Sequence, residues 1–153
     1  MNDKRDTILS NGSSALLGLA LALAAQSPAS ALDAFEHALS AYEQGHYQSA
    51  YQLVKHSAEG GDAQAQHILG VMYRKGLGVE PDEYTAFDWC KQAAENGLLE
   101  AQFQLGLMYL QGEGVTEDEE QAQQWLWTAA DRGYPQASEV LQFIFSQDFT
   151  VGC

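Results

Sequence analysis

The stretch Ala101-Gln-Phe-Gln-Leu-Gly-Leu-Met-Tyr-Leu-Gln-Gly-Glu-Gly-Val115 decides the fold of this 153-residue chain. It recurs in altered form when the sequence is shifted by 36 residues. The same residue type stands at three successive positions of that shift in five sets: Ala50, Ala86 and Ala122; Ala58, Ala94 and Ala130; Gly61, Gly97 and Gly133; Ala65, Ala101 and Ala137; and Leu69, Leu105 and Leu141. So many coincidences in one register indicate a protein built from repeats.

Within one unit, the apolar and small residues follow the period of a helix. Ala101, Leu105, Gly106 and Tyr109 stand at i, i+4, i+5 and i+8, which places them on one helix face. The next segment, around Trp125, has the same pattern. Each unit is therefore predicted to be a helical hairpin. Because one hairpin cannot bury its apolar face alone, the hairpins are expected to stack into an all-α solenoid.

Glycine and aspartate mark the ends of the predicted helices. Two Gly-x-Gly-Val segments, which start at Gly76 and Gly112, end a helix with residues that tolerate positive φ. Asp82 and Asp118 then stand where an N-cap is expected, and Gln121 follows Asp118 as in a capping box. These signals predict seven helices, over residues 32–44, 46–59, 62–75, 82–95, 98–111, 118–131 and 134–147.

The N-terminal segment is predicted to be a signal peptide. Residues 15–25 carry no polar side chain. A membrane-spanning helix needs about 20 such residues, whereas a shorter run suits the core of an export signal. Pro28 is expected to end any helix there, and Ala29-Ser30-Ala31 provides the small residues that a signal peptidase reads, so cleavage is expected after Ala31. Export implies the periplasm or the secreted space. The alternative is a short apolar helix that stays in the fold.

The charge balance excludes several classes of partner. The chain has 21 acidic and 7 basic residues, and its formal charge is −14. Nucleic acids and anionic membranes both repel such a surface, so neither is expected as a partner, and no membrane insertion is expected after signal cleavage. Apolar residues make up 46% of the chain, which argues against disorder.

Residues 101–115, followed by Ala122-Gln-Gln-Trp-Leu-Trp-Thr-Ala-Ala130, resemble the Sel-1-like repeat of the tetratricopeptide superfamily. The resemblance implies a right-handed α-solenoid with a concave and a convex face. Together with the signal peptide, it predicts these parts of the chain: a signal peptide at 1–31, a repeat domain at 32–147 and a tail at 148–153, the domain comprising a plain tetratricopeptide hairpin at 32–61, full repeats at 62–97 and 98–133, and a capping half repeat at 134–147.

The resemblance also implies a function. Many relatives are exported bacterial proteins that act as binding or adaptor modules, so it implies a non-catalytic interaction module that binds a peptide or protein in its concave groove. The first helix of each hairpin lines the groove in such solenoids. The inward positions counted from the repeat are the predicted binding residues: Phe35, Leu39, Tyr42, His67, Val71, Arg74, Lys75, Phe103, Leu107, Leu110, Gln111 and Phe143, with Glu139 beside them. The alternative is that these side chains only pack against neighbouring helices.

Two neighbouring cations in this set suggest a specific contact. Arg74 and Lys75 are adjacent in a chain that has few basic residues. Such a pair beside the groove suits a carboxylate, for example a peptide C-terminus. Alternatively, the two charges complement the dipole at the C-terminal end of their helix.

The cysteines, histidines and glycines indicate no catalytic site. Cys90 is equivalent in the repeat to Val54 and Leu126, which favours a small buried residue. Cys153 ends the tail, and a Cys90–Cys153 disulfide or an intermolecular bond are both open. No pair of the four histidines has zinc-site spacing, and no nucleophile, nucleotide or metal signature occurs. No cofactor, metal or catalytic residue is therefore predicted.

Three further expectations complete the sequence analysis. Trp127 stands where the repeat has Lys55 and Lys91, which suggests an exposed indole and a second contact point, and the alternative is an indole that lies flat on its own helix pair. A cysteine-rich subset of the family implies the rival function, a cell-wall-linked β-lactam-binding protein or hydrolase, although those relatives carry a cysteine pair in each repeat. A third hypothesis is a structural component that stacks into oligomers through its apolar ends.

Overall fold

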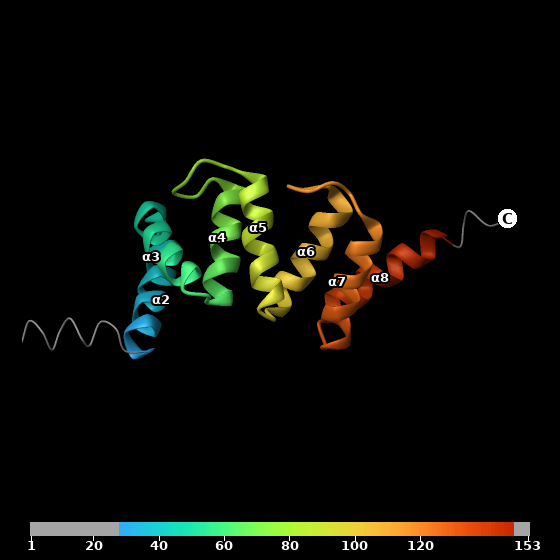
Figure 1. Cartoon of the computed structure of the whole chain (residues 1–153), viewed down its shortest axis with the longest axis horizontal. Coiled ribbons are helices and arrows are strands. Elements are labelled where there is room, and N and C mark those ends of the chain that lie inside the picture. Colours follow the sequence, from blue (N-terminus) through green and yellow to red (C-terminus); the bar gives the residue numbers. More distant parts are fainter. Residues whose placement is uncertain (1–27, 149–153) are drawn as a thin grey trace, which may run out of the picture.

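The computed structural model describes residues 28–148, with side chains from 33 to 146. All regular structure in that range is helical, and no strand occurs within it. The helices follow one another in a row in chain order, so the first and the last of them lie at opposite ends (Figure 1). Their bounds are α2 (Pro28–Glu43), α3 (Tyr47–Glu59), α4 (Ala63–Lys75), α5 (Glu83–Glu95), α6 (Leu99–Gln111), α7 (Glu119–Asp131) and α8 (Pro135–Asp148).

The all-α solenoid of stacked hairpins is confirmed, and helices α3 to α8 each begin one residue after the predicted start. For three of them, the residue predicted as the first is instead an aspartate N-cap. Asp62 Oδ1 accepts a hydrogen bond from the backbone N of Ala65 at 2.7 Å, and Asp82 caps α5 in the same way. Asp118 accepts one from the backbone N of Gln121 at 3.0 Å, which is the aspartate half of the predicted capping box.

Helix α2 corrects one prediction. It begins at Pro28, whereas a helix was expected only from residue 32 and Pro28 was expected to end any helix. Proline is favoured in the first turn of a helix, because the backbone N–H that it lacks would have no partner there. The predicted cleavage point after Ala31 therefore falls inside the start of α2. The remainder of the predicted signal peptide, residues 1–27, lies outside the described residues.

Three clusters of buried apolar side chains form the core. The first cluster contains Val54 and Leu69, the second contains Leu105, and the third contains Leu126. Each helix packs against the helix before it and the helix after it. The core is therefore spread along the row, as expected for a repeat protein in which each unit contacts only its neighbours.

The second glycine of each Gly-x-Gly turn also joins one hairpin to the next. Gly78 and Gly114 have φ values of 70° and 69°, which fits the positive φ expected of the turns. A Cβ on Gly78 would overlap the backbone carbonyl of Tyr47, and a Cβ on Gly114 would overlap that of Glu83. Tyr47 and Glu83 each open the second helix of the preceding hairpin. These turns therefore need glycine for close approach as well as for backbone conformation.

Two buried glutamines connect successive hairpins through hydrogen bonds. Gln66 Nε2 donates to the carbonyl oxygen of Ala58 at 3.2 Å, and its Oε1 accepts from Asn96 Nδ2 at 2.8 Å. Gln102 has the same arrangement 36 residues further on: it donates to a backbone carbonyl at 3.1 Å and accepts from Arg132 Nη1 at 3.1 Å. Each glutamine thus gives a second donor to a carbonyl near the end of the preceding second helix, which also accepts a backbone N–H from the turn that follows.

Candidate functional site

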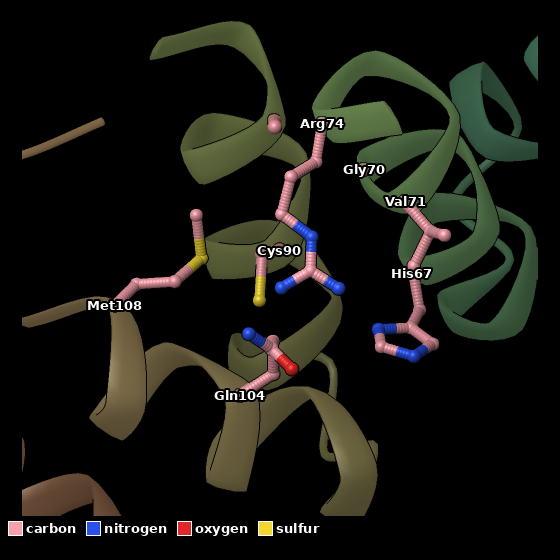
Figure 2. Close-up of a pocket in the computed structure, with 8 residues that line it drawn as sticks. His67, Gly70, Val71, Arg74, Cys90, Gln104 and Met108 are labelled. Carbon is pink, nitrogen blue, oxygen red and sulfur yellow. The ribbon is translucent and has the colours of Figure 1, made fainter. Parts of the chain in front are cut away.

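A depression lies where α4, α5 and α6 meet (Figure 2). It is small and partly open to solvent, and the space of about 220 Å³ between its lining residues includes open solvent. Helices α4 and α6 form its two sides, and α5 lies between them. The lining residues are His67, Gly70, Val71 and Arg74 from α4, Ala86 and Cys90 from α5, and Gln104 and Met108 from α6.

Polar side chains from three helices converge in this depression. The Arg74 guanidinium, the Cys90 thiol and the Gln104 amide point toward one another (Figure 2). Arg74 Nη1 also lies 3.8 Å from Oε2 of Glu113, in the turn that follows α6. The Cys90 thiol donates to the carbonyl oxygen of Ala101 at 3.5 Å. Arg74 thus reaches from the second hairpin to the third and brings a positive charge between them.

Burial shifts the pKa of two groups in the depression. It lowers the pKa of His67, an effect that the charge of Glu100 opposes and that of Arg74 reinforces. It also raises the pKa of Cys90 to about 12, although Arg74 counteracts this rise. At neutral pH the imidazole is therefore held toward its neutral form and the thiol stays protonated. A protonated thiol is a poor nucleophile, so the site offers hydrogen bonds and one cation rather than cysteine chemistry.

The structure brings three of the predicted binding residues together in the depression: His67, Val71 and Arg74. Lys75, next in sequence to Arg74, is exposed and lies outside this lining. The depression therefore separates the two cations that the sequence analysis treated as a pair.

The other predicted binding residues are distributed along the row. Phe35 and Tyr42 pack against the first cluster, while Phe103 and Leu110 pack against the third. The Phe103 ring also lies 5.1 Å from the ring of Tyr134, measured between centroids. The remaining predicted residues are half-buried or exposed: Leu39 and Leu107 are half-buried, and Lys75, Gln111, Glu139 and Phe143 are exposed.

The α5 and α6 residues of the depression are not among the predicted binding residues. Inward positions were counted one helix at a time, so Gln104 and Met108, which line the depression together with residues of α4, were left out. A signal for Gln104 exists in the repeat register, where it stands between Ile68 and Val140. Cys90 was predicted to be buried, and its exposed fraction of 4% confirms this.

A second group of side chains is exposed near the end of the row. Trp127 is 55% exposed, which confirms the prediction of an exposed indole. Its ring lies 6.1 Å from that of Phe145 on α8, and Phe145 is itself 43% exposed. Phe143, also on α8, is 63% exposed. These aromatic residues come from the last two helices of the described chain.

The described part of the chain contains no group of three histidine, cysteine or carboxylate side chains placed to hold a metal ion. None of the helices in residues 28–148 is long and apolar enough to cross a membrane. Cys153, the other half of the predicted disulfide with Cys90, lies outside the described residues, so that bond stays a prediction.

The family model of the Sel1 repeat matches residues 13–46, 63–98 and 99–134. This chain belongs to the Sel1 repeat family. The first match overlaps the predicted signal peptide at 1–31, and the other two follow the hairpins α4–α5 and α6–α7. A comparison with curated proteins found no match.

Solved structures of Sel1 repeat proteins resemble this one. The chain is 32% identical to c5321, a protective antigen of uropathogenic Escherichia coli with an SLR fold (TM-score 0.73, covering 77% of this chain and 26% of that one). It is also 32% identical to a Sel1 repeat protein of Oxalobacter formigenes (TM-score 0.70, covering 74% of this chain and 46% of that one). This Sel1 chain thus spans less than half of either relative.

A third solved structure shares the fold alone. Helicobacter pylori cysteine rich protein B is 18% identical, with a TM-score of 0.59, and the match covers 76% of this chain and 98% of that one. Sel1 repeats are protein-interaction modules, and the proteins built from them are generally non-catalytic scaffolds. The family therefore places this Sel1 chain among interaction modules.

Proposed function

We propose that this chain is a non-catalytic adaptor, regulator or assembly factor of the bacterial periplasm or secreted space, and that it binds a peptide or protein along the first helices of its hairpins. Those first helices are α2, α4, α6 and α8. The family supplies the general role of protein interaction. The surface is chosen because the first helices carry apolar residues at the same position of each repeat.

One observation carries the choice of surface. Phe35, Val71, Leu107 and Phe143 stand 36 residues apart, one on each first helix, and all four are apolar. We call this set the inner ladder. None of the four is fully buried, and Phe143 is 63% exposed. The neighbouring core position behaves differently, because Leu69 and Leu105 are completely buried.

The inner ladder suits a chain of repeating apolar side chains. Apolar residues that stay partly exposed in one row across a protein mark interaction surfaces more often than scattered exposed residues do. An extended peptide or an amphipathic helix presents side chains at regular intervals and would bury both its own apolar surface and that of the ladder. The partner class is therefore a peptide or a protein segment with regularly spaced apolar residues.

The proposed compartment rests on the N-terminal sequence. The apolar run at 15–25 and the small residues at 29–31 support export. Because the cleavage point predicted after Ala31 lies at the start of α2, removal of the signal would shorten that helix without reaching Phe35. Intact-mass measurement of the exported protein checks this, and an exported chain that still begins at Met1 contradicts it.

A matched pair of variants tests the proposed surface. Phe143→Ser removes an exposed aromatic residue from the inner ladder, and Tyr84→Ser removes one that is 75% exposed on α5, outside the ladder. Both variants are used to capture crosslinked partners from envelope fractions. The proposal expects Phe143→Ser to reduce capture and Tyr84→Ser to leave it unchanged. Equal capture by both variants and the parent chain contradicts the proposal.

The non-catalytic part of the proposal has its own test. The β-lactam hypothesis expects the purified protein to turn over nitrocefin, whereas the proposal expects no turnover. The raised pKa of Cys90 agrees with the proposal, since the thiol stays protonated near neutral pH. Turnover that persists through purification and is lost on substitution of a residue in the depression contradicts it.

A further inference from the structure

An aromatic pair joins each of the second helices α3 and α5 to the first helix that follows it. The rings of Tyr51 and Tyr73 lie 5.9 Å apart, and those of Phe87 and Tyr109 lie 5.4 Å apart, measured between centroids. The two pairs occupy equivalent positions of the repeat, 36 residues apart. Phe87 is buried and the other three residues are half-buried. These two pairs are therefore part of the packing between neighbouring hairpins.

The aromatic pair of α7 and α8, the last two helices of the row (Figure 1), departs from this pattern. The position of Tyr51 and Phe87 is Gln123 on α7, and the aromatic residue stands one turn later, at Trp127. The centroid of the Trp127 ring lies 6.1 Å from that of Phe145, and the two residues are 55% and 43% exposed. Packing between the hairpins therefore gives no reason for an indole at this position.

The equivalent residues on the other second helices are lysines. Trp127 corresponds to Lys55 on α3 and to Lys91 on α5. Lys55 Nζ lies 3.9 Å from Oε1 of Glu59, one turn later, and 6.0 Å from the centre of the Tyr51 ring. Helix α3 thus places a cation between an aromatic ring and a carboxylate at this position of the repeat.

Helix α7 has the ring and the carboxylate but not the cation. Asp131 is equivalent to Glu59 and stands one turn after Trp127, on the same face of α7. It is exposed and forms no ion pair with another side chain in the described part of the chain. The helix dipole opposes a carboxylate in the last turn of a helix, so stability of α7 gives no reason for this charge. We call Trp127, Phe145 and Asp131 the α7 site.

The nearest basic residue in the sequence is engaged elsewhere. Residues 93–153 contain ten acidic residues and one basic residue, Arg132. Arg132 Nη1 donates to the carbonyl oxygen of Gly97 at 2.8 Å and to Oε1 of Gln102 at 3.1 Å, so its guanidinium is held toward the start of α6. A cation at the α7 site is therefore one that another molecule supplies.

The chemistry of the α7 site fits a lysine or arginine side chain. The face of an aromatic ring, and of an indole most of all, attracts a cation, and the carboxylate adds an ion pair. The apolar stem of such a side chain can lie against the Phe145 ring. The formal charge of −14 attracts a basic segment over a longer range, whereas it repels a second copy of this chain. Charge complementarity therefore favours a basic partner.

We infer that the α7 site binds a lysine or arginine side chain from a basic segment of a partner protein, with the cation over the Trp127 ring and paired with Asp131. The site lies outside the inner ladder, so this inference goes beyond the proposed function and does not depend on it. It gives the chain a second contact, at one end of the row of helices.

Peptides with charged and uncharged lysines test the inference. In the first peptide lysine and alanine alternate, and in the second every lysine is acetylated, which removes the charge and keeps the side chain. Each peptide is titrated into the isotope-labelled full chain while the indole N–H signal of Trp127 is followed by NMR. The lysine peptide is expected to shift this signal until it saturates, and the acetylated peptide is expected to leave it unchanged.

A matched pair of lysine variants tests the ring. Trp127→Lys installs the residue of the two preceding repeats, and its affinity for the lysine peptide is expected to fall at least about tenfold. Tyr84→Lys replaces an aromatic residue that is 75% exposed on α5 and changes the net charge equally. It is expected to stay within about twofold of the parent chain. Fluorescence anisotropy of the labelled peptide measures both affinities.

A second pair of variants tests the carboxylate. Asp131→Asn removes the charge of the α7 site, and Glu95→Gln removes the equivalent charge on α5, where Lys91 stands one turn earlier. Asp131→Asn is expected to weaken binding of the lysine peptide about threefold, which is the size of an exposed ion pair. Glu95→Gln is expected to leave the affinity unchanged. Melting curves check that each variant is folded.

Four results would overturn the inference. If the acetylated peptide binds as tightly as the lysine peptide, the site recognises an apolar segment. If Trp127→Lys and Tyr84→Lys lose the same affinity, net charge alone attracts the peptide. If Asp131→Asn and Glu95→Gln bind equally, the carboxylate has no role. If light scattering finds a dimer that Trp127→Lys dissociates, a second copy covers the site. None of these results bears on the inner ladder, which Phe143→Ser tests separately.

Discussion

At the scale of single residues, His67 shows how the fold changes the chemistry of a side chain. Burial is the largest influence on its imidazole and lowers the pKa, Glu100 raises it, and Arg74 lowers it. The neutral ring has one N–H donor and one acceptor, whereas the charged ring has two donors. The fold therefore favours the form that can donate to a ligand without adding a second positive charge beside Arg74.

The lowered pKa of His67 predicts how stability changes with pH. In the unfolded chain the histidine has its ordinary pKa of 6.5, so below about this pH the unfolded state binds a proton that the folded state resists. Stability should therefore fall as the pH drops from about 7.5 to about 5. His67→Phe, with the residue of the next repeat, should remove part of that fall. Urea unfolding at both pH values measures it, and an identical fall in both proteins contradicts the assignment.

Two glutamines of helix α6 should respond oppositely to the same substitution. Gln102 is 5% exposed and forms two hydrogen bonds, one to Ala94 of the preceding hairpin and one to Arg132 of its own, whereas Gln104 forms none within the described residues. Gln102→Leu removes both hydrogen bonds of this buried amide and should cost about 1–3 kcal/mol of unfolding free energy. Gln104→Leu should cost nothing or increase stability. Chemical denaturation compares the two variants, and equal losses contradict the distinction between structural and free amides.

The sequence was sufficient to predict the burial or exposure of a residue where its equivalents in the other repeats indicate it. Burial of Cys90 and exposure of Trp127 both followed from their equivalents. The buried roles of Gln66 and Gln102 could not be predicted, because a glutamine on a helix is ordinarily exposed and its partners lie on other helices or at their ends. The gathering of Gln104 with Arg74 also depends on how neighbouring hairpins pack.

At the scale of helices and turns, local signals determined most boundaries. The aspartate N-caps and the glycines after α4 and α6 gave the bounds of the later helices to within one residue. Helix α2 escaped this reasoning, because Pro28 is equally compatible with the end of one helix and the start of another. The packing of the Gly-x-Gly turns was also missed, since positive φ alone already explained those glycines.

Alanine substitution at two glycines distinguishes the stability cost of backbone strain from the stability cost of close packing. Gly45 has a φ of 78° and no atom within 4 Å of an added Cβ, so Gly45→Ala should cost only the left-handed conformation, about 1–2 kcal/mol. Gly114 has a similar φ, but an added Cβ would overlap Glu83 and press on Phe87. Gly114→Ala should therefore cost about 1–3 kcal/mol more. Equal losses in unfolding free energy would mean that the turn does not hold the hairpins together.

At the scale of the whole molecule, most of the residues that hold the stack together are not residues of the proposed binding surface. The stack depends on the three apolar clusters, the close turns at Gly78 and Gly114, and the hydrogen bonds of Gln66 and Gln102. Phe35 of the inner ladder packs against the first cluster, whereas Val71, Leu107 and Phe143 belong to none of the three clusters. The helices follow one another along the row (Figure 1), so the four residues of the inner ladder lie on successive first helices.

This division between stacking and binding is the central claim, and the repeat supplies a direct test. The variant with Arg74→Leu, Gln104→Val and Glu113→Leu gives the depression and the turn beside it the apolar residues that stand 36 residues away, at Leu110, Val140 and Leu77. The ion pair that it removes is partly exposed and contributes little, while the new side chains bury apolar surface. The melting temperature of this variant, measured beside that of the parent chain, should be equal or higher. A melting temperature several degrees lower would show that Arg74, Gln104 and Glu113 hold the hairpins together and would contradict the account.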